Sequence, residues 1–342
     1  MPAAFRLLTA VLVAVLAVPL AACGGASGAG PTEDELVIYS GRNKELIGDL
    51  LERYARDTGA KIFVRYGETA ELAAQLLEEG ERSEADVFFA QDAGALGALA
   101  KSGALAKLPR AVLTEVEPRF RSSAGHWVGV SGRARVLAYD PRKVSKDELP
   151  DSVFDLTDPR WKDSVGFAPT NASFQAFVTG MRELAGEDRT RQWLTDMRAN
   201  GMKAYVDNIR VLEAVDRGEV ALGLINHYYW YEKVAEEGEQ NVAARIEFLG
   251  NGDPGALVNV AGAGILATSD QREPAEEFVA FLLSRKAQRY FAETTEEYPL
   301  AAGVRPAAGV PPLDSLDPPR IDLSDLDSLQ QTLRLLEEVG LT

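Results

Sequence analysis

The most constraining feature of this sequence is an alternation of extended and helical patterns that begins near residue 36. Residues 36–40 and 61–66 are β-like, and residues 86–90 have the pattern of a buried strand. Between them, residues 44–58 and 71–79 place leucines at helical spacing, and a glycine follows each segment. This β-α-β order predicts a parallel sheet covered by helices, with ligands near the carboxyl ends of the strands.

The second half of the chain shows the same alternation. Strands are expected at residues 165–169 and 220–225, and helices at residues 173–185, 190–198 and 208–215. The repetition predicts a second α/β lobe, with its own sheet and its own helical layers.

Two long extended segments are typical of crossings between lobes: residues 127–139, with a break expected at residues 131–133, and residues 258–268. The length of 342 residues also exceeds what one hydrophobic core usually organises. We therefore expect two lobes joined by two extended hinge crossings. The first would comprise residues 36–132 plus 262–308, and the second residues 133–261 plus 309–342, ending in an amphipathic helix at 324–339.

The amino terminus has the pattern of an export signal. Arg6 precedes an apolar run at residues 7–20, which leads into Leu-Ala-Ala-Cys at residues 20–23. This pattern predicts a lipoprotein signal peptide at residues 1–22, a lipidated Cys23, and a flexible tether over residues 23–35. We expect an exported protein, lipid-anchored on the outer face of the cytoplasmic membrane, at the cell surface or in the periplasm.

Composition excludes several classes of function. The chain has 52 acidic and 36 basic residues, a net charge of −16, so nucleic acid is an unfavourable partner. The single cysteine and two histidines, His126 and His227, argue against zinc, iron-sulfur and imidazole-based metal sites. Membrane contact is expected through the lipid anchor alone, and we expect a monomer.

The most informative cluster is a run of four aromatic residues, Tyr228 to Tyr231, directly after the strand expected at residues 220–225. Neighbouring tyrosines in a loop at a strand end can direct their hydroxyls into one cleft. Ferric iron is a hard cation that prefers anionic oxygen ligands, and a phenolate supplies one. An aromatic core cluster or an interface belt is the alternative reading of these four residues.

Candidate anion-binding residues lie elsewhere in the chain. Asn171, Ala172 and Ser173 open one expected helix and Asn208 begins another, so both helix starts offer backbone N–H groups. Arg42 and Arg133 are expected on loops that face the same cleft. Ordinary helix caps and surface arginines are the alternative interpretation.

Two enzyme-like strings do not support catalysis. Residues 262–267 match a dinucleotide-binding pattern, but the residues after Gly264 are apolar and extended rather than the start of a helix. Residues 129–133 lack the last glycine of a nucleophile elbow, although His126 lies nearby and keeps a hydrolase using Ser131 as an alternative. We expect no enzyme activity.

Six ordered blocks then resemble the ferric-ion-binding proteins of bacterial iron ABC importers, which have the type II periplasmic-binding-protein fold. The likeness runs the length of the mature chain. The blocks are residues 37–42, 79–87, 131–136, 226–230, 253–257 and 297–300.

The resemblance implies specific roles. Tyr228 and Tyr229 match the tandem tyrosines that ligate Fe(III), the transported ligand. Asn226, Asn208 and residues 171–173 match positions that hold a synergistic anion, carbonate or phosphate. Arg42 and Arg133 match arginines that contact carbonate in some relatives, a geometry suited to a planar oxyanion.

The sequence also departs from this family. Asn43 and Gln91 stand where one branch has a histidine and a glutamate, and Asn171 stands where another branch has a third tyrosine. Only two protein ligands are therefore expected with certainty, and the anion with water would fill the other positions. Tyr39 and Asp92 are further candidates for the cleft.

The function that the resemblance implies is the extracytoplasmic binding component of an iron ABC transporter, with a permease and its ATPase as partners. The nearest alternative is the same fold binding another small solute, such as a phosphonate, thiamine or a polyamine. A sensor or adhesion role on the same fold is a further alternative.

Overall fold

The computed structural model describes residues 30–32 and 34–342. The predicted signal peptide, Cys23 and most of the predicted tether therefore lie outside the described residues. No helix within the described part is long and apolar enough to cross a membrane.

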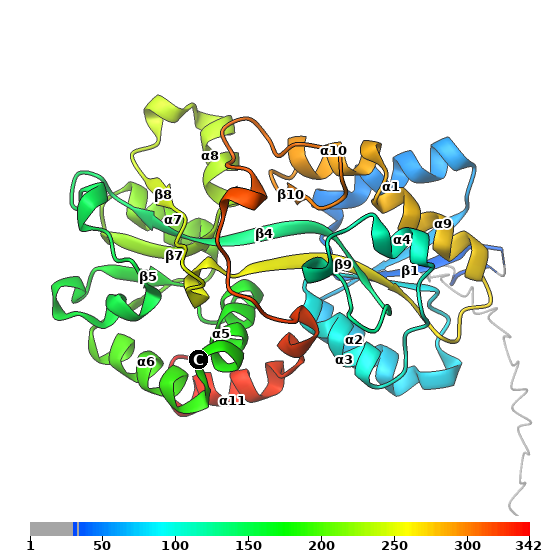
Figure 1. Cartoon of the computed structure of the whole chain (residues 1–342), viewed down its shortest axis with the longest axis horizontal. Coiled ribbons are helices and arrows are strands. Elements are labelled where there is room, and N and C mark those ends of the chain that lie inside the picture. The colour runs from blue at the N-terminus through cyan, green and yellow to red at the C-terminus, as the bar shows by residue number, and fades with distance from the viewer. Residues whose placement is uncertain (1–29, 33) are drawn as a thin grey trace, which may run out of the picture. The chain divides into compact units, whose positions relative to one another are not determined.

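One mixed β-sheet organises residues 34–342, with strands in the order β2-β1-β3-β9-β4-β7-β5-β6. β1, β2 and β3 are parallel at one end, and β5, β6 and β7 are parallel at the other. The two long strands β4 and β9 pair antiparallel between these groups (Figure 1). The strands are β1 (Leu36–Ser40), β2 (Ile62–Tyr66), β3 (Val87–Ala90), β4 (Val128–Tyr139), β5 (Val165–Phe167), β6 (Lys203–Ala204), β7 (Leu222–Asn226), β8 (Arg245–Glu247), β9 (Val258–Ile265) and β10 (Tyr298–Pro299).

The helices confirm most of the predicted segments, with boundaries that shift by a few residues. They are α1 (Lys44–Thr58), α2 (Thr69–Glu79), α3 (Ala93–Lys101), α4 (Arg110–Thr114), α5 (Ala172–Ala185), α6 (Glu187–Ala199), α7 (Asn208–Asp216), α8 (Tyr228–Glu237), α9 (Arg272–Leu282), α10 (Arg285–Glu293) and α11 (Leu329–Glu338). The predicted tail helix is divided, because a short 3₁₀ turn, Leu323–Asp327, precedes α11 and Ser328 leaves the helical conformation.

Strand β4 corrects one expectation from the sequence. A break was expected at residues 131–133, but β4 continues from Val128 to Tyr139 and all 12 of its residues are buried. The irregularity is only a register shift between Gly129 and Ser131. Glycine permits this close pairing, because a Cβ on Gly262 of β9 would lie 2.7 Å from the Val128 carbonyl oxygen. Residues 262–265 of the dinucleotide-like string belong to β9, which agrees with the extended conformation predicted after Gly264.

The buried apolar side chains form separate clusters around the two groups of strands. One cluster combines residues 36–134 with residues 257–326, and two others draw on residues 136–256. Leu335 and Leu336 of α11 and the following Val339 pack into a cluster of the second group, whereas Leu323 and Leu326 of the preceding turn pack into the first cluster. The C-terminal segment therefore contacts both cores, and the exact lobe boundaries stay a prediction.

The packing of α11 gives a test of this arrangement. Leu336 is fully buried, so Leu336→Ala should lower the free energy of unfolding by about 2–5 kcal/mol through lost transfer energy and a residual cavity. Leu77→Ala is the matched control, because Leu77 is 47 % exposed and should change stability by only about 0.5 kcal/mol or less. Urea unfolding measures both, and equal effects would show that α11 does not pack as described.

Candidate metal-binding site

The two candidate tyrosines lie where strand β7 passes directly into helix α8. The sequence analysis placed these tyrosines in a loop, and this prediction is wrong, because α8 begins at Tyr228 and His227 already has helical backbone angles. The His227 amide donates to the Ala134 carbonyl oxygen at 3.0 Å, which fixes the turn against β4. The rings of Tyr228 and Tyr229 lie side by side, with centroids 4.2 Å apart and planes inclined by 34°.

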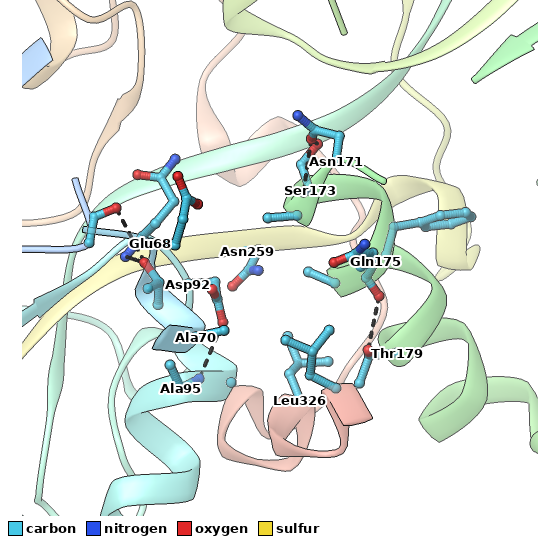
Figure 2. A pocket seen from close by; sticks show the side chains of 18 of the residues that line it. Glu68, Ala70, Asp92, Ala95, Asn171, Ser173, Gln175, Thr179, Asn259 and Leu326 are labelled. Atoms are coloured by element: carbon cyan, nitrogen blue, oxygen red, sulfur yellow. Dashed lines mark hydrogen bonds between the residues drawn. The ribbon is translucent and has the colours of Figure 1, made fainter. Parts of the chain in front are cut away.

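Tyr228 and Tyr229 both line a pocket of about 610 Å³. Figure 2 shows α2 and the start of α3 on one side of the pocket, α5 on the other, and the C-terminal segment at one end. The β7-α8 junction also contributes to the wall, through Asn226, Tyr228 and Tyr229. The pocket also gathers most of the residues predicted from the sequence: Asn43, Gln91, Asp92, Arg133, Asn171, Ala172, Ser173 and Asn226.

The other two aromatic residues of the run lie elsewhere. Trp230 donates its indole N–H to the Ala244 carbonyl oxygen at 2.8 Å, and the Tyr231 hydroxyl donates to the Gly309 carbonyl oxygen at 2.9 Å. Both line a different cavity. The aromatic run is therefore divided between a tyrosine pair in the first pocket and two structural aromatic residues outside it.

Three predicted residues do not line the first pocket. Arg42 is fully buried, and its guanidinium donates to both carboxylate oxygens of Glu297, at 2.9 and 2.8 Å. The expectation that Arg42 faces the cleft is not met, because this ion pair holds it in the interior. Tyr39 is also buried, and its hydroxyl donates to Glu79 at 3.3 Å.

Asn208 is the third of these residues, and it lies outside the lining but holds two lining residues in place. Its side-chain amide donates to Asn171 Oδ1 at 3.0 Å and to Ser173 Oγ at 2.9 Å. Asn171 Oδ1 in turn accepts from the Ser173 amide at 3.0 Å, which caps the first turn of α5. The predicted anion seat is thus a connected polar group at a helix N-terminus.

Arg135 is the main residue of the pocket that the sequence reasoning missed. Only 4 % of it is exposed, and its Nη1 donates to Ser173 Oγ and to Asn226 Oδ1, both at 3.3 Å. Its Nε and Nη2 have no hydrogen-bond partner among the described residues. Burial lowers the pKa of Arg135 to about 10, so the group stays cationic at neutral pH.

Arg133 lies in β4 rather than on a loop. It donates to the Gln91 carbonyl oxygen, and its Nε lies 3.8 Å from Glu297. Glu297 also accepts from Ser131 Oγ at 2.9 Å and from Thr295 Oγ1 at 3.1 Å. Burial acts to raise the pKa of Glu297, but the charges and hydrogen bonds of Arg42, with the charge of Arg133, hold it below its ordinary value.

These contacts remove Ser131 from consideration as a nucleophile. The Ser131 side chain is fully buried in β4 and its hydroxyl donates to the carboxylate of Glu297. His126 contacts the Leu105 carbonyl oxygen through Nδ1 at 2.9 Å. Neither residue lines the pocket that holds the tyrosines.

The phenols of the tyrosine pair are neutral without a bound cation. Burial raises the pKa of Tyr228 well above its ordinary value, and the neighbouring Tyr229 acts in the same direction. Burial also raises the pKa of Tyr229, although hydrogen bonds with Tyr228 and Asn208 and the charge of Arg133 oppose it. A ligand that makes phenolates here must therefore supply strong positive charge.

The donor chemistry of the site is that of oxygen. Among residues 30–32 and 34–342, no three histidine, cysteine, aspartate or glutamate side chains are grouped so that they could hold a metal. Asp92 does line the pocket, where its Oδ1 accepts from the Ala95 amide at 3.2 Å as the cap of α3. His227 does not line it and stacks on Tyr298 at 4.7 Å. Any metal in this pocket would thus meet phenol, amide and carboxylate oxygens.

The fold has two groups of parallel strands joined by β4 and β9, and helices from both groups flank a polar pocket. This arrangement is that of a type II periplasmic solute-binding protein. Residues 83–317 match the family of bacterial extracellular solute-binding proteins, and this chain belongs to that family.

Individual relatives agree with this assignment. The chain is 36 % identical over 335 residues to the "Major ferric iron-binding protein" of Neisseria meningitidis serogroup B, covering 97 % of this chain and 99 % of the relative. It is 35 % identical to the "Fe(3+)-binding periplasmic protein" of Serratia marcescens, covering 96 % and 97 %. The crystal structure of iron-bound HitA from Pseudomonas aeruginosa superposes with a TM-score of 0.82 at 38 % identity, covering 90 % of this chain and 99 % of that one. The resemblance and the fold class predicted from the sequence are confirmed.

The buried charge network beneath the pocket gives a second test. Glu297→Gln leaves Arg42 and Arg133 without their carboxylate, so the free energy of unfolding at pH 7 should fall by about 3–5 kcal/mol. In the wild type, the lowered pKa contributes stability that is present above the ordinary glutamate pKa and is lost as pH falls through the folded-state value. Urea unfolding against pH should show this acid-side loss in the wild type and not in the variant.

The control for this experiment is Glu293→Gln, an exposed glutamate on α10. It should leave stability within about 0.5 kcal/mol of the wild type. If Glu297→Gln behaves like Glu293→Gln, the buried ion pair does not stabilise the fold.

Proposed function

We propose that this protein binds ferric iron in the 610 Å³ pocket through the phenolates of Tyr228 and Tyr229 and delivers it to an ABC permease with its ATPase. The observation that carries the proposal is the tyrosine pair: two adjacent phenol side chains that line one polar pocket. The relatives named for ferric iron binding support the choice of metal. The protein acts as a binding component and not as an enzyme.

Charge balance supports an anion as part of the bound complex. A trivalent cation with two phenolates keeps one positive charge, and the cationic Arg133 and Arg135 line the same pocket. Asp92 is a carboxylic acid that lines this pocket, and burial raises its pKa. Carbonate or phosphate, with water, would neutralise this excess and fill the coordination positions that the tyrosines leave open.

The anion would bind at the start of α5. Asn171, Ala172 and Ser173 line the pocket there, and the first turn of a helix is electropositive. Arg135 brings its positive charge to the same place, where its Nη1 donates to Ser173 Oγ, and Asn226 and Asn208 hold the polar group in position. The same two guanidinium groups disfavour thiamine and polyamines, the cationic alternatives for this fold.

Capture and release would follow a hinge motion. The proposed lobes are residues 36–132 plus 262–308 and residues 133–261 plus 309–342, and they would close about β4 and β9. Lipidation at Cys23 would keep the mature protein at the outer face of the cytoplasmic membrane, close to the permease. This localisation rests on the sequence of residues 1–23.

The ligand assignment predicts a spectroscopic result. Titration of the apo-protein with ferric citrate should produce a visible phenolate-to-iron charge-transfer band. The double variant Tyr228→Phe/Tyr229→Phe should lose the band and at least a hundredfold in iron affinity, because it keeps the rings but removes both oxygen ligands. Tyr231→Phe is the matched control, since the Tyr231 hydroxyl donates to Gly309 outside the pocket. A double variant that retains colour and affinity would refute the assignment.

Proton release gives a further prediction. Both phenols are neutral before iron binds, so each coordinated tyrosine releases one proton. The logarithm of the apparent iron affinity should therefore rise by about two for each pH unit below the phenol pKa values, and affinity should weaken on acidification. Competition with citrate at fixed carbonate, corrected for the protonation of both competitors, measures this slope. Tyr229→Phe should reduce it to about one, and a slope near zero would exclude phenolate ligands.

A further inference from the structure

The C-terminal segment connects the two walls of the metal pocket. We call the turn Leu323–Asp327 together with Ser328 and α11 the C-terminal strap. The turn contacts α3 and α5, and α11 lies along α5 (Figure 1). Figure 2 shows Leu326 between Ala95 of α3 and Thr179 of α5. The strap therefore joins the walls in addition to β4 and β9, and it lines one end of the pocket through Leu326, Asp327, Leu329 and Gln330.

The turn meets α3 by close backbone contact. A Cβ added at Gly97 would lie 2.3 Å from the Ser324 carbonyl oxygen, and one added at Gly94 would lie 2.2 Å from the Leu326 carbonyl oxygen. Glycine disfavours the interior of a helix, so two glycines three residues apart in α3 need a reason. The reason is that they let the strap approach the helix backbone.

Side chains of the turn strengthen this contact. Leu323 and Leu326 are buried in the first apolar cluster. The Trp127 indole N–H donates to Ser324 Oγ at 3.2 Å. Dispersion contacts weaken steeply with separation, so this attachment is lost once the turn moves away from α3.

The other half of the strap is held to α5 by a polar network. The Arg182 guanidinium donates to the Ser328 carbonyl oxygen at 3.2 Å, to Ser328 Oγ at 2.9 Å and to Thr332 Oγ1 at 3.0 Å. The buried hydroxyls of Thr179 and Thr332 share a hydrogen bond of 2.7 Å. Hydrogen bonds from a charged donor are stronger than neutral ones, so the α5 side is the firmer attachment.

The two attachments compete when the pocket opens. Hinge motion about β4 and β9 would separate α3 from α5, and the strap contacts both helices. The weaker attachment, between the turn and α3, is the one that would break.

We propose that the strap is a latch: the contact of the turn with α3 holds the pocket closed around bound iron, and breaking this contact limits release of the metal. The proposal rests on the function proposed above and adds the step that controls release from that site.

Two variants loosen the latch from opposite sides, so that misfolding of one leaves the other as a test. Gly97→Ala places a Cβ against the Ser324 carbonyl oxygen, and Leu323→Ala removes a buried side chain of the turn. Neither Gly97 nor Leu323 lines the pocket. Each variant should speed iron release about tenfold or more, because losing a contact of this size lowers the barrier to opening. The phenolate-to-iron band should keep its wild-type position, because the tyrosines are unchanged.

Stopped-flow absorbance measures the release rate from the loss of this band. A strong chelator is added in such excess that the rate no longer depends on its concentration. Circular dichroism checks that each variant is folded. Hydrogen exchange at residues 323–327 should become faster in Gly97→Ala and Leu323→Ala, which shows that the turn has been loosened.

Two further variants are the controls. Gly48→Ala adds a Cβ to α1 at an ordinary contact distance of 3.5 Å from Lys44 Cγ. Leu336→Ala removes a buried side chain from α11 but leaves the turn on α3. Both should release iron at the wild-type rate, although Leu336→Ala lowers stability.

The possible failures are distinguishable. Wild-type release rates in both latch variants overturn the proposal, and so does unchanged hydrogen exchange of the turn. Release from Leu336→Ala as fast as from Leu323→Ala also overturns it, because general instability then explains the effect. A wild-type protein that gives no visible band with ferric iron fails the proposed function itself, and this inference falls with it.

Discussion

The site depends on one constraint, the uninterrupted burial of strand β4. This strand pairs with β9 over most of its length and then with β7, so it belongs to both groups of parallel strands. Because side chains alternate along a strand, Arg133 and Arg135 project to the same face. That face is the pocket, and the register with β7 brings Asn226 opposite Arg135. The position of the tyrosine pair follows, since α8 begins two residues after Asn226.

Several arginines are buried close together, and the positive charge of each needs partners that offset it. The structure offsets these three charges to different extents. Arg42 is fully neutralised by Glu297, so it contributes to stability and to the rigidity of the region beneath the pocket. Arg133 is shared between Glu297 and the Gln91 carbonyl oxygen. Among the described residues, Arg135 has neutral hydrogen-bond partners only, and two of its nitrogen donors have no partner. The cationic charge that the fold leaves unbalanced is therefore located where the proposed anion binds.

The sequence predicted most strands, most helices and the tyrosine pair because their signals are local: apolar runs, helical spacing and consecutive aromatic residues after a strand. It could not place Arg42, since its partner Glu297 lies 255 residues away in the chain. The sequence analysis also missed the start of α8, because His227 makes no side-chain cap hydrogen bond and is not a residue type that indicates a helix start. Arg135 could have been predicted, because side chains two residues apart in a strand project to the same face and Arg133 was already a candidate.

The raised pKa values of the tyrosines also bear on metal selectivity. A buried phenol loses its proton only when the attraction between the phenolate and the cation exceeds the penalty of burial. That attraction grows in proportion to the charge of the cation, so a trivalent ion gains half as much again as a divalent ion at the same distance. The two buried arginines add repulsion that a divalent ion, with its weaker phenolate bonds, compensates less well. In the proposed function, burial thus makes the tyrosine pair a poor ligand for divalent metals while leaving it effective for ferric iron.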